Sequence, residues 1–269
     1  MSLVIIFDAD NTLWDTDSVF RGAQLDLLRV FVHAGLIREE SAELETLRAV
    51  DQELVRQLGR FEYDFSALCT AMAHYHSGQP NAQQAVTRTI NEHQLDSALS
   101  DLIARAHSAF EAGLHKIPAL FPDTERVLLA IHSYRSIDAG VAVLIFSDGA
   151  PERLERILDA HQIRSRGFFD EIIMDRKTVE SFKRAKDTGR KFLPQVENNS
   201  KTRFMMVGDS LQRDIKLANQ AGYVTVYKPG GFLGRESAQQ PDEEPTFVIQ
   251  TLSGLIPVLT ELGLAIKDQ

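Results

Sequence analysis

Short, nearly continuous apolar runs recur along the chain and are separated by helix-like segments in its second half. The runs lie at residues 3–7, 142–146, 169–174, 203–207 and 223–227, with a shorter one at 247–249. Runs of this length without polar alternation are typical of strands buried on both faces, as in a parallel sheet. We predict helices between them, including one over residues 211–220, and an irregular loop over residues 228–245. This alternation predicts an α/β fold with a Rossmann-like, doubly wound parallel sheet.

Residues 18–114 have a different, almost wholly helical pattern. Apolar residues recur at three- and four-residue steps, as Leu47, Val50 and Leu54 do. The pattern predicts helices near residues 20–32, 41–58, 64–76, 81–93 and 95–110. Because this stretch contains no strand candidate, we predict that an all-helical domain, residues 15–115, is inserted into an α/β core formed by residues 1–14 and 116–269.

The composition indicates the compartment in which the protein works and argues against some classes of partner. The chain has 269 residues and a formal net charge of -9, which disfavours binding to a nucleic-acid backbone. No apolar stretch approaches the ~20 residues of a membrane span, and the N-terminus does not resemble a signal peptide. The single cysteine, Cys69, fits a reducing compartment. We therefore expect a cytoplasmic protein without nucleic-acid or membrane partners.

Chemically useful side chains follow four of the predicted strands. They are Asp8 and Asp10 after the first, Ser147, Asp148 and Gly149 after the second, Lys177 after the third, and Asp209 and Asp214 after the fourth. Singly, each group fits an ordinary turn. The carboxyl ends of parallel strands share one edge of a sheet, so these groups can converge there. Clustered carboxylates suit Mg²⁺, while a lysine, a hydroxyl and turn amides suit a phosphoryl group.

These residues resemble the motifs of the haloacid dehalogenase superfamily of hydrolases. Residues 7–13 (FDADNTL) match its first motif and residues 208–214 (GDSLQRD) its fourth, while Ser147 and Lys177 match the second and third. The helical insertion lies where members of this superfamily carry a cap domain.

The resemblance implies an Mg²⁺-dependent phosphohydrolase that cleaves a small phosphorylated metabolite through an aspartyl-phosphate intermediate. It implies that Asp8 is the nucleophile and Asp10 the general acid/base. Asp8, the Asp10 carbonyl and Asp209 would hold Mg²⁺, with Asp214 supporting the metal site. Ser147 and Lys177, with the Asp148–Gly149 turn, would bind the phosphoryl group.

Two positions depart from the superfamily pattern. Asp148 stands where relatives often have asparagine, and its charge must point away from a phosphate. The third motif, commonly Gly-Lys-Pro, reads Arg-Lys-Thr at residues 176–178, which leaves Lys183 and Lys186 as alternatives. We favour Lys177, because Lys183 would lie roughly 9 Å further along the following helix at 1.5 Å per residue.

Two alternative functions use the same groups. A phosphomutase would differ only in its cap and in its exclusion of water. A non-enzymatic regulator resembling a receiver domain also carries acids, a hydroxyl and a lysine on a parallel sheet. Asp10 and the large insertion argue against the receiver. Asp10 also argues for phosphate esters over haloacids, because a departing halide needs no proton.

Overall fold

The computed structural model of the chain describes residues 2–59, 64–78, 81–91, 97–194, 202–230 and 237–266. The chain divides into two compact units. Residues Met1–Asp17 and Ile117–Gln269 form the core unit, and residues Ser18–Lys116 form the helical unit. None of the described helices is long and apolar enough to cross a membrane.

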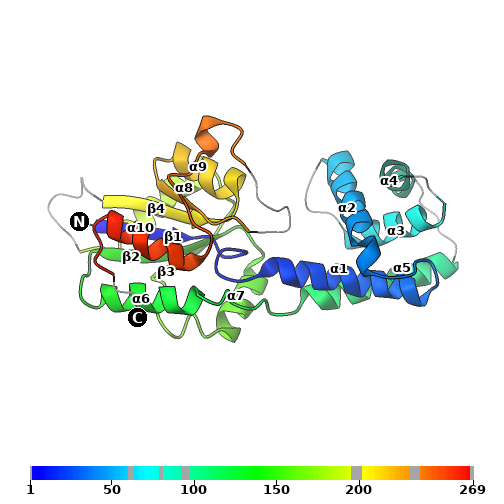
Figure 1. Cartoon of the computed structure of the whole chain (residues 1–269), viewed down its shortest axis with the longest axis horizontal. Coiled ribbons are helices and arrows are strands. Elements are labelled where there is room, and N and C mark those ends of the chain that lie inside the picture. Colours follow the sequence, from blue (N-terminus) through cyan, green and yellow to red (C-terminus); the bar gives the residue numbers. More distant parts are fainter. Residues whose placement is uncertain are drawn as a thin grey trace. The chain divides into compact units, whose positions relative to one another are not determined.

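The described strands of the core unit form one parallel sheet with the order β3-β2-β1-β4-β5-β6 (Figure 1). The strands are β1 (Ser2–Phe7), β2 (Val141–Ser147), β3 (Glu171–Met174), β4 (Thr202–Gly208), β5 (Val224–Tyr227) and β6 (Phe247–Val248). The central strand β1 pairs with β2 on one side and β4 on the other. The chain therefore winds outward in both directions from β1, and the end of this strand lies at the switch point where such sheets bind ligands.

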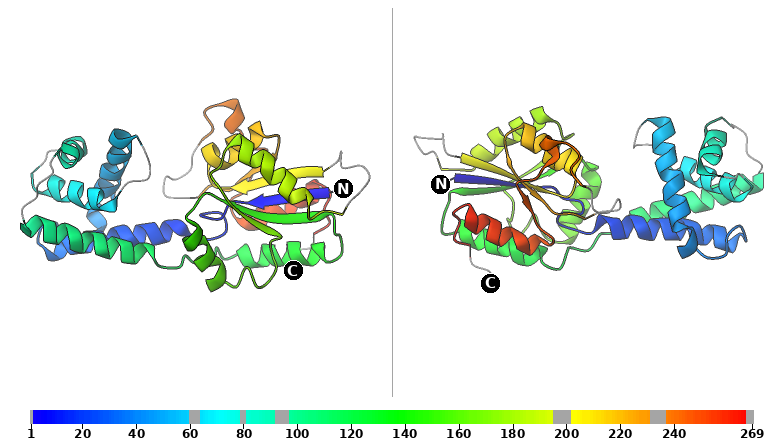
Figure 2. Two further views of the ribbon diagram at one scale, coloured as in Figure 1. Left: turned by 180° about the vertical axis from the view of Figure 1, so that it is seen from behind. Right: turned by 45° about the horizontal axis from the view of Figure 1, so that its top comes forward.

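Helices cover both faces of the sheet (Figure 2). They are α6 (Thr124–Arg135), α7 (Pro151–Ala160), α8 (Val179–Arg190), α9 (Lys216–Gln220) and α10 (Leu255–Glu261). Alternate residues of β1 belong to different cores: Ile5 lies in the cluster that includes residues of α6, α7 and α10, whereas Ile6 lies in the cluster with residues of α8 and α9. Both side chains are fully buried, which explains the continuous apolar run and confirms the predicted fold class.

Two segments of the core unit differ in detail from the sequence prediction. The single helix expected over residues 211–220 begins as a π-helical turn, Leu211–Ile215, which continues into α9. Within the expected loop, Pro241–Glu243 forms a short 3₁₀ helix, and Glu243 is buried and accepts a hydrogen bond from Gln212. Residues 231–236 of that loop lie outside the described residues.

The described part of the helical unit contains helices near each of the predicted positions. They are α1 (Thr16–His33), α2 (Leu44–Leu58), α3 (Phe65–His76), α4 (Ala82–Asn91) and α5 (Ser97–Leu114), with residues 92–96 outside the described part. Helices α1 and α5 run side by side (Figure 2) and meet where Gly113 faces Ala23. A Cβ atom on Gly113 would lie 2.6 Å from the Cα atom of Ala23, so only glycine allows this approach.

This close approach predicts opposite effects for two glycine-to-alanine substitutions in the helical unit. Gly113→Ala should lower the free energy of unfolding by about 1–3 kcal/mol, the usual cost of overpacking. Gly22→Ala, one residue from Ala23, should be neutral or raise that free energy by up to about 1 kcal/mol, because nothing lies within 4 Å of its new Cβ and alanine favours the helix. Urea unfolding followed by circular dichroism measures both, and equal changes would contradict the packing described here.

Candidate active site

The first acid, Asp8, is held at the carboxyl end of β1. Its backbone N–H donates to the Val207 carbonyl at 2.8 Å, which extends the pairing of β1 with β4, and the residue is only 5% exposed. The chain then turns sharply through Asn11, whose φ of 57° is left-handed. Thr12, after the turn, lies with its hydroxyl 3.5 Å from a carboxylate oxygen of Asp8. Asp8 therefore lies at the edge of the sheet, where β1 ends and the turn begins.

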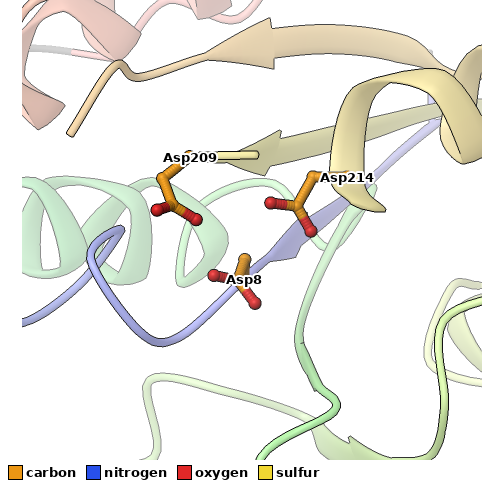
Figure 3. Close-up of side chains that lie close together, drawn as sticks. All are labelled: Asp8, Asp209 and Asp214. Atoms are coloured by element: carbon orange, nitrogen blue, oxygen red, sulfur yellow. The ribbon is translucent and has the colours of Figure 1, made fainter. Parts of the chain in front are cut away.

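Asp209 and Asp214 approach Asp8 from the end of β4. Ser210 caps the π-helical turn, because its hydroxyl accepts from the Arg213 N–H and its own N–H donates to the Asp214 carboxylate at 2.9 Å. A Cβ atom on Gly208 would lie 2.5 Å from that carboxylate, so glycine at this position leaves room for it. One carboxylate oxygen from each of the three aspartates lies within 4.8 Å of the other two (Figure 3).

Lys177 lies between two of these carboxylates. Its ammonium donates to Asp8 and, at 2.7 Å, to Asp214, and its side chain is 2% exposed. The backbone is fixed by the capping box of Thr178 at the start of α8. The two alternative lysines lie elsewhere: Lys183 is exposed beside Glu180, and Lys186 donates to the Ala221 carbonyl.

Ser147 and the turn after β2 lie on the same edge. The Ser147 hydroxyl is buried and accepts from the Gly149 N–H at 3.1 Å. A Cβ atom on Gly149 would lie 3.3 Å from the Ser147 hydroxyl and 3.4 Å from an Asp10 carboxylate oxygen. Glycine therefore keeps open the space between these two polar groups. The side chain of Asp148 lies 3.5 Å from the guanidinium of Arg213.

The Asp10 carboxylate has partners that the sequence did not reveal. One nitrogen of Arg153 lies 2.9 and 3.0 Å from its two oxygens, Trp14 donates to it at 2.9 Å, and the Thr16 hydroxyl also donates to it. Arg153 lies in the first turn of α7, and Arg213 lies in the turn that follows β4. Their shared position, in the first turn after a motif-bearing strand, is the sequence signal that could have identified both arginines.

A family comparison agrees with this arrangement. The sequence profile of the haloacid dehalogenase-like hydrolases matches residues 3–222. The chain belongs to this family. The resemblance inferred from the motifs is thereby confirmed, and the protein is a hydrolase of this family.

Individual relatives of this hydrolase are distant but match over nearly their full lengths. A glyceraldehyde 3-phosphate phosphatase from Methanopyrus kandleri is 24% identical over 263 residues, covering 98% of this chain and 99% of the relative. A haloacid dehalogenase-like hydrolase from Xanthomonas campestris matches with a TM-score of 0.59 at 17% identity, covering 97% of this chain and 91% of its own. A structure of a putative hydrolase of the family from Bacillus subtilis, bound to magnesium, matches with a TM-score of 0.56 at 18% identity. This match covers 96% of this chain and 98% of the Bacillus subtilis chain. The two structures show that the fold is shared.

Burial and mutual repulsion shape the charge of the hydrolase site. Burial raises the pKa of Asp8 to about 7, although Lys177 acts in the opposite direction. Burial, with the neighbouring Asp8 and Asp214, raises the pKa of Asp209 to about 9. For Lys177, burial opposes the charged form, but the carboxylates of Asp214 and Asp8 outweigh it and raise the pKa. One ammonium does not neutralise three carboxylates, and their oxygens are the donors that a hard divalent cation prefers. The residues therefore fit such a cation.

This charge pattern predicts how pH and Mg²⁺ together affect stability. Without metal, protonated Asp8 and Asp209 contribute to the stability of the folded protein at low pH, because their pKa values are raised in the folded state. This contribution is lost as the pH rises from about 4 through about 7 for Asp8 and through about 9 for Asp209. Metal binding requires ionised ligands, so the increase in Tm caused by MgCl₂ should be larger at about pH 8 than at about pH 5.

Asp209→Asn is the decisive variant for this prediction. Thermal unfolding with and without MgCl₂ should show that it loses most of the Mg²⁺-dependent increase. The control Asp187→Asn, which removes an exposed acid paired with Arg190, should retain that increase. An increase that is equal at both pH values, or that survives in Asp209→Asn, would refute the metal assignment.

Proposed function

We propose that this hydrolase is a Mg²⁺-dependent phosphatase that cleaves phosphomonoesters of small metabolites. The observation that carries the proposal is the buried cluster in which Lys177 bridges Asp8 and Asp214 and in which Asp209 lies within 4.8 Å of both aspartates. A nucleophilic carboxylate, a cation and a metal-binding acid at one point are the parts that phosphoryl transfer needs. The relative named glyceraldehyde 3-phosphate phosphatase supports a small phosphorylated substrate.

In the proposed reaction, an oxygen of Asp8 attacks phosphorus and the bond from phosphorus to the alcohol oxygen breaks. Asp10 gives its proton to the departing alcohol, which leaves an aspartyl phosphate on Asp8. Asp10 then takes a proton from water as the water attacks this phosphorus. The bond from phosphorus to the Asp8 oxygen breaks, inorganic phosphate departs, and the Asp8 carboxylate is restored. Lys177, the Ser147 hydroxyl and the Gly149 turn bind the phosphoryl oxygens.

The residues proposed to hold Mg²⁺ are Asp8, Asp209 and the Asp10 carbonyl, with Asp214 in support. When bound, the ion reduces the repulsion between the Asp8 carboxylate and a phosphate dianion. The magnesium bound to the Bacillus subtilis relative agrees with this choice of cation.

Asp10 favours phosphate esters over haloacids as substrates. An alkoxide leaving group needs a proton, whereas a halide leaves without one. The carboxylate of Asp10 lies beside the Ser147–Gly149 turn, where the phosphoryl group is proposed to bind.

The assay that tests this proposal measures hydrolysis of p-nitrophenyl phosphate and of glyceraldehyde 3-phosphate, with MgCl₂ and with excess chelator. The unaltered protein should be active only with the metal, and Asp8→Asn should lower kcat about 10³-fold or more, because the nucleophile is lost. Acid quenching followed by mass spectrometry should find phosphate on Asp8. Turnover in chelator, or phosphate on another residue, would contradict the mechanism, and no hydrolysis of either ester or of a panel of phosphorylated metabolites would contradict the function.

A pair of lysine variants tests the phosphoryl-binding cation. Lys177→Met removes the buried ammonium and should lower kcat/KM at least tenfold, or about 1.4 kcal/mol of transition-state stabilisation. Lys183→Met removes an exposed lysine of the same helix region and should resemble the unaltered protein. Circular dichroism confirms that both variants fold. If Lys183→Met is the inactive variant, the third motif has been placed wrongly.

A further inference from the structure

Two acids beside the three-aspartate cluster each have an arginine partner. Arg153 contacts Asp10, and Arg213 contacts Asp148. Both arginines come from the turn that opens the helical segment after a motif-bearing strand. The second pair is of interest because Asp148 lies between Ser147 and Gly149. An acid therefore occupies the turn that is proposed to bind a phosphate dianion.

The structure fixes the direction from which Arg213 approaches. Its N–H donates to the Ser210 hydroxyl at 3.3 Å, which holds its backbone in the first turn after β4. Its guanidinium lies 3.5 Å from the Asp148 carboxylate. The side chains of Arg213 and Asp148 are 63% and 26% exposed, and ion pairs exposed in this way contribute little to folding. Stability alone therefore gives little reason for the pair.

The charges around the site explain better why Arg213 lies beside Asp148. The charges of Lys177 and a divalent cation together balance those of the three clustered carboxylates, and the charge of Arg153 balances that of Asp10. The remaining acid, Asp148, is close enough for its field to act on the ammonium that is proposed to bind phosphate: after Asp214 and Asp8, it is a further carboxylate that raises the pKa of Lys177 against the effect of burial. An uncompensated Asp148 would repel an incoming dianion.

We propose that Arg213 is a positioning residue for phosphoryl binding, because its guanidinium neutralises Asp148 and so allows an acid to lie in the phosphate-binding turn. This inference rests on the proposed phosphatase activity. Arg213 acts through Asp148 and does not itself contact the phosphoryl group. The two modes of action differ in one respect: a residue that acts through Asp148 becomes dispensable once Asp148 carries no charge.

A double-mutant cycle with Arg213→Met, Asp148→Asn and the combined variant tests this dependence. The readouts are KM and kcat for p-nitrophenyl phosphate, and the Kd of inorganic phosphate by calorimetry, both with MgCl₂. Arg213→Met should raise KM and Kd about tenfold and change kcat less than about threefold, as expected for one uncompensated charge near a bound anion. The combined variant should return to within about twofold of Asp148→Asn alone.

Three controls sharpen the cycle. Arg213→Lys keeps the charge and should recover most of the phosphate affinity. Arg164→Met removes an exposed arginine that pairs with Glu155 and should change neither readout. Raising the salt concentration should shrink the penalty of Arg213→Met, because the effect is electrostatic.

Two results would overturn the inference. An equal loss from Arg213→Met with either Asp or Asn at position 148 would mean that Arg213 acts without Asp148, either on the phosphate directly or through Asp214, Asp8 and Asp209, whose charges also act on it. No loss in either background would mean that it has no role in binding. If the unaltered protein binds phosphate but hydrolyses no ester, the proposed function fails, and the Kd cycle still decides the role of Arg213.

Discussion

The pairing of Lys177 with Asp8 and Asp214 is the interaction on which the rest of the site depends. Placing an ammonium and two carboxylates where almost no water reaches them costs free energy that their attraction repays only in part. A cluster of apolar side chains would stabilise the fold at least as well. Asp209 adds a third carboxyl group, so the site carries more negative than positive charge once all three are ionised, and the raised pKa values of Asp8 and Asp209 express this repulsion. Such an arrangement disfavours the protein alone and favours it with a cation, which is expected of a site selected for chemistry.

The fold supplies this site by ending several strands at one edge. The central strand β1 delivers Asp8, and its two neighbours, β2 and β4, end at Ser147 and at the residue before Asp209. The cations come from the segments just beyond the strands. Glycines at positions 149 and 208 leave room between these groups, because a Cβ atom at either position would crowd a polar side chain of the site. The acids, the cations and the space between them therefore all result from the strands of the sheet ending at one edge.

The sequence predicted the parts of the structure that depend on local patterns, and it missed those that depend on distant contacts. Continuous apolar runs located β1, β2 and β4, since both faces of these strands are buried. The third strand begins at Glu171 instead of residue 169, because the Asp170 side chain accepts from the Val143 N–H and pairs with Arg135. The π-helical turn at Leu211–Ile215 was also invisible to a helical pattern. The position of Arg213 just after β4 could mark it as a candidate from the sequence, but the turn decides where its side chain points, so its pairing with Asp148 could be found only in the structure.

The contacts of Asp10 connect its geometry to its proposed role. Arg153 and Trp14 can only donate hydrogen bonds, and both donate to the Asp10 carboxylate. The structure therefore holds the Asp10 carboxylate as an acceptor, but its two oxygens have different surroundings. Trp14, Thr16 and one contact of Arg153 all reach Oδ1, whereas Arg153 is the only one of these three residues that also contacts Oδ2. A proton on Oδ2 would therefore leave the three contacts of Oδ1 in place. Oδ2 is also the oxygen that faces the Gly149 turn, where the phosphoryl group is proposed to bind. The contacts of Asp10 thus favour Oδ2 as the atom that gives and takes the proton in the proposed cycle.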